Sequence, residues 1–385
     1  MTFRRARRLG SLVQSDIRRM TRECERVGGI NLGQGICDLP TPPLVREGAI
    51  AAIRAGKSTY SFAEGALELR AAIARKLAER NGIQADPMRE IVVTVGATGA
   101  FACAIHALLD PGDGILVMEP YYGYHLNCAL LAGLEPQFLT LRAPEFRLDE
   151  AALRAALRPN SRAIVLCTPN NPSGRMFTRA ELDALARVAR EKDLWVITDE
   201  IYEDIRYDGR PHVSPATIPG LADRTITILG LSKTFSITGW RLGYAVAKPD
   251  VAEALQLVND LYYICAPTPL QHGVAAGFSA PSSFFTDLAD DYARKREKLC
   301  RALEQAGLAP VWPEGAYYVL ADVSAMGCAS SRDAALRLLE ETKVASVPGS
   351  AFYRGAEGER VVRFCFAKEH DALDEACCRL AAFRP

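Results

Sequence analysis

Lysine is scarce in this chain, and one lysine stands where lysine is unusual. Lys233 follows the apolar run Thr225–Leu229, and a Gly/Ser/Thr-rich segment leads from it to Arg241, eight positions on. A lysine amine that is shielded from water and lies near other cations has a lowered pKa, so it becomes a nucleophile near neutral pH. The spacing therefore indicates covalent amine chemistry at this point of the chain.

Other polar side chains follow apolar runs in the same way. Asp199 comes directly after Leu194–Thr198, and Tyr202 follows it by three positions. Asn171 stands between two prolines after the run Ala163–Cys167. A carboxylate at the mouth of a buried sheet is costly unless it meets a cation or hydrogen-bond donors. By themselves, the aspartate would also suit a helix N-cap and the asparagine a rigid turn.

Small residues and an aromatic ring follow two further apolar runs. The run Ile91–Val95 leads straight towards Ala97 and Thr98, where bare N–H groups at a helix start could bind a phosphate. The pattern is neither G-x-G-x-x-G nor a Walker A loop, so it does not support nucleotide binding, and a tight turn remains the alternative. Tyr122 follows Ile115–Met118 and either stacks on a flat ligand or packs in the core.

Alternating strands and helices must position these residues. The apolar runs have four to six residues, which is typical of strands buried on both faces, and helical segments separate them. We therefore expect an α/β fold with a mostly parallel sheet, whose ligands bind at the carboxyl ends of the strands. The expected strands are Ile91–Val95, Ile115–Met118, Ala163–Cys167, Leu194–Thr198 and Thr225–Leu229, and the expected helices are Ala66–Arg80, Ala97–Leu109, Arg179–Glu191 and Phe284–Gln305.

The pattern changes after about residue 285. A long helix leads to short apolar runs and a closing helix, which predicts a smaller α+β domain over residues 285–385. Residues 1–40 contain none of the main strands, so we expect an N-terminal arm that packs with this small domain. Residues 41–284 then form the large domain. The short runs are Tyr317–Leu320, Val344–Val347 and Val361–Phe366.

Composition limits the classes of function. The chain has 385 residues, and 46 Lys+Arg balance 46 Asp+Glu, so a nucleic-acid binder is disfavoured. No run approaches the ~18 apolar residues of a membrane span. The eleven cysteines form no C-x-x-C pair and the five histidines show no metal spacing, so we expect reduced thiols, no metal and a cytoplasmic enzyme. The basic segment Arg4–Arg8 is expected to be a solvated arm or to pack on a partner subunit, and a transit peptide is the less favoured alternative.

Four features together fit one kind of ligand: a helix start that could bind phosphate, an aromatic ring that could stack, a carboxylate and a lysine. That ligand is an aromatic aldehyde phosphate that forms a Schiff base, namely pyridoxal phosphate. At this point the chain resembles the fold-type I pyridoxal-phosphate enzymes, specifically the class I/II aminotransferases. The segment Ser-Lys-x-Phe-x-x-x-Gly-Trp-Arg around Lys233 is its most specific part. The resemblance implies an aspartate-aminotransferase-like fold with a seven-stranded-type main sheet. It also extends over Asn31–Gly35, Tyr60, Glu68–Arg70, Asn171–Gly174, Pro313–Tyr318, Val347–Gly349 and Arg363–Phe364.

The resemblance implies how the cofactor ring is held. Lys233 forms the internal aldimine and later carries the proton between the substrate Cα and the cofactor C4′. Asp199 pairs with the pyridinium nitrogen and keeps it protonated. Tyr202 and Asn171 hydrogen-bond the phenolic oxygen, and Tyr122 stacks on the ring.

The resemblance also implies a phosphate site and a dimer. Ala97 and Thr98 supply backbone and hydroxyl donors to the phosphate, Arg241 supplies a charged contact, and Ser232 supplies a further donor. Tyr60 reaches the phosphate of the neighbouring subunit. The family pattern thus implies a homodimer with a shared active site.

Substrate recognition is implied at a third place. Arg363 grips the substrate α-carboxylate bidentately, Asn171 assists, and Gly35 lets the substrate approach the N-terminal segment. Many aspartate-specific relatives have a lysine where Thr98 stands, so its absence weakens an aspartate assignment. The aromatic residues Tyr262 and Tyr263 are expected near the pocket of the other subunit, which favours apolar or aromatic substrates.

The expected reaction is ping-pong transfer of an amino group from an amino acid to a 2-oxo acid, in amino-acid metabolism or biosynthesis. The same cofactor residues would serve a β- or γ-lyase, a cyclase or an oxidase, so these reactions remain the alternative. A cofactor-sensing domain of a transcription regulator is disfavoured, because Lys233 is present and no added basic helix-turn-helix domain is visible.

Overall fold

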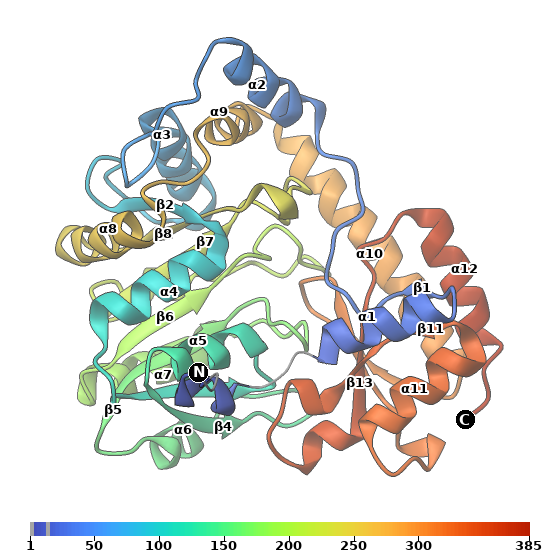
Figure 1. The fold of residues 1–385 in the computed structure, drawn as a ribbon. Coiled ribbons are helices and arrows are strands. Elements are labelled where there is room, and N and C mark those ends of the chain that lie inside the picture. The colour runs from blue at the N-terminus through green and yellow to red at the C-terminus, as the bar shows by residue number, and fades with distance from the viewer. Residues whose placement is uncertain (1–3, 13–15) are drawn as a thin grey trace.

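The computed structural model describes residues 4–12 and 16–385, apart from the side chain of Ser11. Its largest element is a seven-stranded sheet with the order β2-β8-β7-β6-β5-β3-β4 (Figure 1). All neighbouring pairs are parallel except those of β8, which is antiparallel to both β2 and β7. The predicted α/β class with a mostly parallel main sheet is confirmed. The strands are β2 Ile91–Val95, β3 Gly114–Glu119, β4 Glu135–Thr140, β5 Ser161–Cys167, β6 Trp195–Asp199, β7 Thr225–Gly230 and β8 Leu242–Val246.

The five strands expected in this sheet are all present, and two more were not predicted. β4 has the sequence Glu-Pro-Gln-Phe-Leu-Thr and lies at the sheet edge, so only part of it is buried. An edge strand needs no continuous apolar run, so the polar residues of β4 give no clear strand pattern in the sequence. β8 follows the polar segment around Lys233 within a few residues, and its antiparallel direction depends on the turn between β7 and β8.

Helices cover both faces of the main sheet. One face packs on α4, α5 and α8 around residues such as Val117 and Ile228. The other face packs on α6 and α7 at one end and on α2, α3 and α9 at the other. These helices are α2 Pro43–Arg54, α3 Leu67–Lys76, α4 Gly96–Leu108, α5 Gly123–Leu131, α6 Glu150–Ala156, α7 Arg179–Glu191, α8 Pro249–Tyr263 and α9 Thr268–Gly277.

A second, smaller core unites the two ends of the chain. An antiparallel sheet of order β12-β13-β10-β9 packs with α10, α11 and α12, and Met20, Cys24 and Leu32 from the N-terminal segment join this core. β1 pairs with β11, so the N-terminal segment is also bound through its backbone. In Figure 1 the blue α1 lies beside the orange and red C-terminal helices.

The remaining helices and strands belong to this smaller unit. The domain bounds 1–40, 41–284 and 285–385 stay a prediction, and residues 1–3 and 13–15 of the arm lie outside the described residues. The elements are α1 Asp16–Arg26, β1 Ile30–Asn31, α10 Ser282–Gln305, β9 Ala309–Val311, β10 Tyr318–Asp322, α11 Ser331–Thr342, β11 Val344–Ala345, β12 Val347–Pro348, β13 Val361–Cys365 and α12 His370–Ala381.

A leucine in α10 tests the small core. Leu299 is fully buried, so Leu299→Ala removes apolar contacts and leaves a cavity, which we expect to destabilise the fold by about 2–5 kcal/mol. Leu131→Ala, at an exposed position of α5, is the matched control and should change stability by less than about 0.5 kcal/mol. Denaturant unfolding measures both variants, and equal effects would contradict this description of the core.

Candidate active site

The carboxyl ends of the main strands surround one cavity of about 350 Å³. The loop after β3, the ends of β6 and β7 and the start of α4 contribute to its walls, as expected for ligand sites of parallel sheets. Seven residues singled out from the sequence line it, namely Ala97, Thr98, Tyr122, Asp199, Ser232, Lys233 and Arg241. The structure therefore brings together residues that lie up to 144 positions apart, from 97 to 241.

Lys233 lies in this cavity with its amine withdrawn from solvent. Burial lowers the pKa of the Lys233 amine to about 8, and the nearby Arg241 acts in the same direction. The amine donates to the carbonyl oxygen of Gly35 at 3.3 Å. A buried amine of lowered pKa has the property that nucleophilic lysine chemistry requires.

Asp199 faces the same cavity from the end of β6. Its Oδ2 is 2.9 Å from Nε2 of His125, which α5 carries. Its Oδ1 is buried and has no hydrogen-bond partner in the part of the chain that the structure describes. A buried carboxylate oxygen without a partner is costly, so the site lacks a donor at this point that a ligand can provide.

A cationic cradle lies at the start of α4. The positive φ of Gly96, +70°, and the side chain of Arg241 explain why no larger residue fits there, since a Cβ on Gly96 would lie 2.6 Å from Nη2 of Arg241. The guanidinium thus lies at the N-terminus of a thirteen-residue helix beside Ala97 and Thr98. A helix N-terminus with an added cation is suited to bind a phosphate.

Two tyrosines meet behind the cavity. The hydroxyl oxygens of Tyr202 and Tyr318 are 3.1 Å apart, and burial raises the pKa of Tyr202. Burial raises the pKa of Tyr318 to about 12, although Arg363 acts in the opposite direction. Both hydroxyls therefore remain protonated at neutral pH and can donate hydrogen bonds.

Arg363 reaches the site from β13 of the small sheet and is only 1% exposed. Its Nη1 donates to Oδ1 of Asn171 at 2.8 Å, and its Nη2 donates to the carbonyl oxygen of Gly33 at 2.6 Å. Its Nε is buried without a partner among residues 4–12 and 16–385. The cation is thus oriented by neutral acceptors, and no carboxylate of the described chain neutralises it, which suits an arginine that binds an anionic ligand.

Five residues that the sequence predicts for the site do not line the cavity itself, namely Gly35, Tyr60, Asn171, Tyr202 and Arg363. Gly35 has no room for a side chain, because a Cβ there would lie 2.0 Å from the Tyr318 hydroxyl oxygen. Tyr60 does not line the cavity, and its side chain is 76% exposed. A contact of Tyr60 with the cofactor phosphate of a neighbouring subunit stays a prediction.

His125 and Tyr318 are functional candidates that sequence reasoning missed. His125 is one of the five histidines that show no metal spacing, so the sequence assigns it no role in a metal site. Its position one helical turn after Tyr122 was the available signal, since residues three positions apart share a helix face. Tyr318 appeared only as part of a motif, and its contact with Tyr202 depends on how the two sheets meet.

The two sheets, the lysine at the end of β7 and the arginine from the small sheet together define the fold-type I pyridoxal-phosphate class. The family model "Aminotransferase class I and II" matches residues 27–380. The chain belongs to the class I and II aminotransferases, and transamination is the reaction that its relatives support.

Named relatives match over nearly the whole chain. Aromatic-amino-acid aminotransferase 2 of Thermococcus litoralis is 35% identical over 97% of this chain and 96% of its own length. Aspartate aminotransferase of Pyrococcus abyssi is 36% identical over 91% of this chain and 90% of its own. The structure of N-succinyldiaminopimelate aminotransferase from Mycobacterium tuberculosis superposes with a TM-score of 0.95, at 34% identity over 98% of this chain and 99% of its own. These names do not favour the lyase, cyclase or oxidase alternative.

The described residues contain neither a candidate membrane-spanning helix nor a candidate metal cluster. No helix among them is long and apolar enough to cross a membrane. No group of three or more His, Cys, Asp or Glu side chains in that same part of the chain could hold a metal ion.

The lowered pKa of Lys233 predicts a pH dependence. In cofactor-free protein, we expect an amine-selective reagent to modify Lys233 with a rate that rises to half its maximum near pH 8. Below that pH the amine is protonated and unreactive, whereas an ordinary lysine has a midpoint near about 10.4. Mass spectrometry of the modified peptide measures the rate. Lys192, which is half exposed, is the control, and identical profiles for both lysines would refute the predicted environment.

Proposed function

We propose that this chain is a pyridoxal-phosphate-dependent amino-acid:2-oxo-acid aminotransferase whose chemistry takes place at Lys233. The observation that carries this proposal is the pairing, in one cavity, of a lysine of lowered pKa with the unpartnered Oδ1 of Asp199. An amine nucleophile and a buried acceptor are the two groups that a pyridoxal ring requires at its opposite ends.

The residues of the cavity fit the cofactor. The free Oδ1 of Asp199 would accept a hydrogen bond from the N–H of the pyridinium nitrogen, and the His125 contact holds the carboxylate in place. Ala97, Thr98 and Ser232 would donate to the phosphate, and Arg241 would neutralise it. The phosphate would thus receive hydrogen bonds from three residues and a neutralising positive charge from a fourth.

Further side chains would hold the ring itself. Tyr122 lines the cavity and would stack on the ring. Tyr202 and Asn171 would donate to its phenolic oxygen. The amide of Asn171 can do so because its Oδ1 accepts from Arg363, so its Nδ2 is the donor that remains.

When bound, pyridoxal phosphate supplies an electron sink for the pair of electrons left on the substrate Cα. Lys233 moves the proton between Cα and the C4′ position, as its lowered pKa allows at neutral pH. Asp199 keeps the proton on the ring nitrogen. Arg363 holds the α-carboxylate. When the Lys233 amine is free, it donates a hydrogen bond to the carbonyl oxygen of Gly35. The proposed net reaction transfers the amino group from an amino acid to a 2-oxo acid in two half-reactions.

We also propose that two copies of the chain share their active sites. Exposed apolar side chains gather beside the cavity, since Tyr263 lies 3.5 Å from the position of a Cβ on Gly99 in α4. The loop after Tyr60 is tied to the end of α8 through Asn259, whose Nδ2 donates to the carbonyl oxygen of Ala63 at 2.8 Å. A contiguous exposed apolar surface favours a protein interface. Its members are Tyr60, Phe62, Leu257, Leu261, Tyr262, Tyr263 and Ile264.

An apolar or aromatic amino donor is the substrate class that we propose. Thr98 takes the place where a lysine would bind a second carboxylate, and the cations lining the cavity, Lys233 and Arg241, have the roles given above. The aromatic residues Tyr262 and Tyr263 would border the substrate of the partner subunit. The names of the relatives include both aromatic and aspartate aminotransferases, so the residues of this chain carry the choice.

The cellular setting is part of the same proposal. The eleven cysteines are free and most are at least partly buried, which suits a reducing compartment such as the cytoplasm. A role in amino-acid metabolism or biosynthesis follows from the substrates. The small core built from both chain ends supports a division into an arm of 1–40, a large domain of 41–284 and a small domain of 285–385.

Substrate turnover tests the reaction directly. The purified enzyme with pyridoxal phosphate is mixed with phenylalanine, tyrosine, methionine, leucine, aspartate and glutamate, and the cofactor absorption band is followed. We expect apolar and aromatic donors to shift the band and to yield the 2-oxo acid. Lys233→Ala should lower turnover by about 10³-fold or more, because the proton carrier is lost. Release of ammonia in place of a 2-oxo acid and an aminated cofactor would refute transamination.

Sedimentation velocity tests the shared site. We expect the wild-type chain to sediment as a dimer and Leu261→Arg to sediment as a monomer with little activity, because a charge enters the exposed apolar surface. Leu131→Arg, on exposed α5, is the matched control and should remain a fully active dimer. A monomeric Leu261→Arg enzyme with normal turnover would contradict the proposal.

A further inference from the structure

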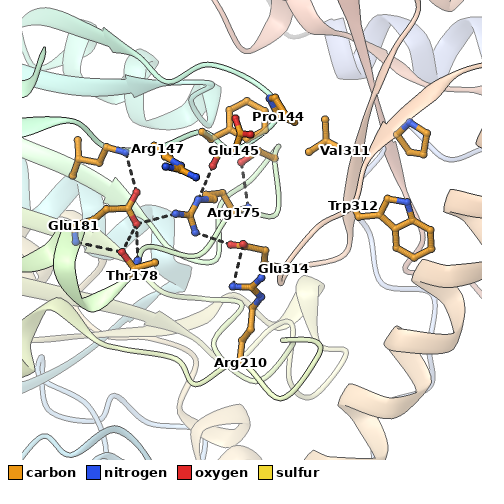
Figure 2. Close-up of a pocket in the computed structure, with 14 residues that line it drawn as sticks. Pro144, Glu145, Arg147, Arg175, Thr178, Glu181, Arg210, Val311, Trp312 and Glu314 are labelled. Carbon is orange, nitrogen blue, oxygen red and sulfur yellow. Dashed lines mark hydrogen bonds and ion pairs between the residues drawn. The ribbon is translucent and has the colours of Figure 1, made fainter.

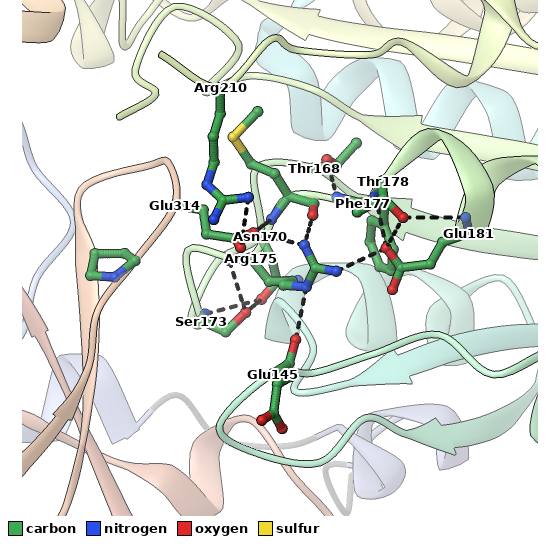
Figure 3. A network of polar contacts seen from close by, with 12 residues as sticks. Glu145, Thr168, Asn170, Ser173, Arg175, Phe177, Thr178, Glu181, Arg210 and Glu314 are labelled. Atoms are coloured by element: carbon green, nitrogen blue, oxygen red, sulfur yellow. Dashed lines mark hydrogen bonds and ion pairs between the residues drawn. The ribbon is translucent and has the colours of Figure 1, made fainter. Parts of the chain in front are cut away.

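Ion pairs join the loop after β5 to the segment that leads into β10 (Figure 3). Arg175 contacts Oε2 of Glu181 through Nη2 at 2.8 Å and Oε2 of Glu314 through Nη1 at 2.7 Å. Its side chain is only 10% exposed. The backbone N–H of Met176 donates to the same Glu314 oxygen at 2.9 Å. We name Arg175, Glu181 and Glu314 the Arg175 clamp.

The two segments also touch through their backbones. The carbonyl oxygen of Gly174 accepts from the N–H of Glu314 at 3.0 Å and from that of Gly315 at 2.8 Å. Gly174 has a φ of +70°, and a Cβ there would lie 2.2 Å from Cβ of Pro313. The crossing therefore has a fixed register with no space for adjustment.

A cavity of about 720 Å³ adjoins the clamp, with Val311 and Trp312 on its far wall (Figure 2). Empty space contributes no packing contacts. On this side of the molecule, the clamp and the Gly174 hydrogen bonds therefore provide the connection between the loop after β5 and the segment that enters the small sheet.

Two of the clamp residues, Arg175 and Glu314, each lie four positions from a residue that contacts Arg363. Asn171 precedes Arg175 and accepts from Nη1 of Arg363 at 2.8 Å. Tyr318 follows Glu314, and its ring centroid is 4.4 Å from Cζ of Arg363. The chain thus forms a closed circuit from Arg363 through Asn171, Arg175, Glu314 and Tyr318 back to Arg363.

We propose that Arg175 and Glu314 are positioning residues that hold Asn171 and Arg363 in the geometry that binds the substrate α-carboxylate. The inference rests on the proposed carboxylate site at Arg363. A closed circuit transmits displacement, because neither the Asn171 loop nor the Glu314 segment can shift without moving a partner of Arg363. Small misplacements of a binding group are sufficient to weaken substrate binding.

Neutralising Glu314 should loosen this circuit. Glu314→Gln keeps the shape of the side chain but removes the charge that Arg175 faces. Because charge-assisted hydrogen bonds are stronger than neutral ones, the Asn171 loop loses part of its anchor. The effect should fall mainly on substrate binding, because Asn171 is the one proposed cofactor contact on this loop and the others lie on other strand ends.

Steady-state kinetics of the holoenzyme test the proposal. For Glu314→Gln we expect KM for the amino donor to rise about tenfold, while kcat and the affinity for pyridoxal phosphate each change by less than about twofold. Arg210→Ala is the matched control, because it removes the exposed cation 3.2 Å from the other oxygen of Glu314 and should leave KM unchanged. If Glu314→Gln fails to fold, Arg175→Lys replaces it as the test. This variant retains one positive charge and should also raise KM.

A double-variant cycle separates positioning from a general structural effect. In an Asn171→Ala background, Glu314→Gln should raise KM no further, because its effect passes through Asn171. Independent, multiplying effects would overturn the inference, as would an unchanged KM in Glu314→Gln. Arg363→Lys distinguishes a failure of the proposed carboxylate site from a failure of the inference about the clamp. If it leaves KM unchanged, the proposed carboxylate site is wrong and the inference falls with it. If only the clamp variants leave KM unchanged, the inference alone is overturned.

Discussion

A buried carboxylate with one unpartnered oxygen is the constraint on which the site depends. Asp199 is held at the end of β6 by His125, yet its Oδ1 meets no donor in the described chain. Folding such a group costs free energy unless a ligand provides the missing donor. The cavity around it therefore suits a ligand that presents a protonated nitrogen, and the neighbouring lysine and cationic cradle suit an aldehyde and a phosphate on the same ligand.

The main sheet places these opposing charges without letting them neutralise one another. Asp199 ends β6, whereas Lys233 and Arg241 both lie in the segment between β7 and β8, and the Arg241 guanidinium reaches the start of α4. Burial lowers the pKa of Lys233 to about 8 because the low-dielectric cavity disfavours its charged form. A parallel sheet suits this purpose, since its strands end at one edge and project side chains into one space.

The small sheet brings a further buried cation to the site. Arg363 enters from β13 and is oriented by Asn171 and the carbonyl of Gly33, which are both neutral. Its charge is thereby kept available for a carboxylate. The same arginine joins parts of the chain that are far apart in sequence, because it comes from β13 and contacts Asn171 after β5 of the large sheet and Gly33 of the N-terminal segment.

The sequence by itself determined the strands Ile91–Val95 and Thr225–Leu229, the place of Lys233 and Asp199 at strand ends, and the α/β class, because apolar run length and the residue that follows are local properties. Tertiary structure alone decided the contacts across the fold. His125 meets Asp199 over 74 positions and Asn171 meets Arg363 over 192, and no local pattern encodes either pair. The sequence did not predict the antiparallel direction of β8 or the pairing of Arg175 with Glu314 either, because both depend on how distant segments pack.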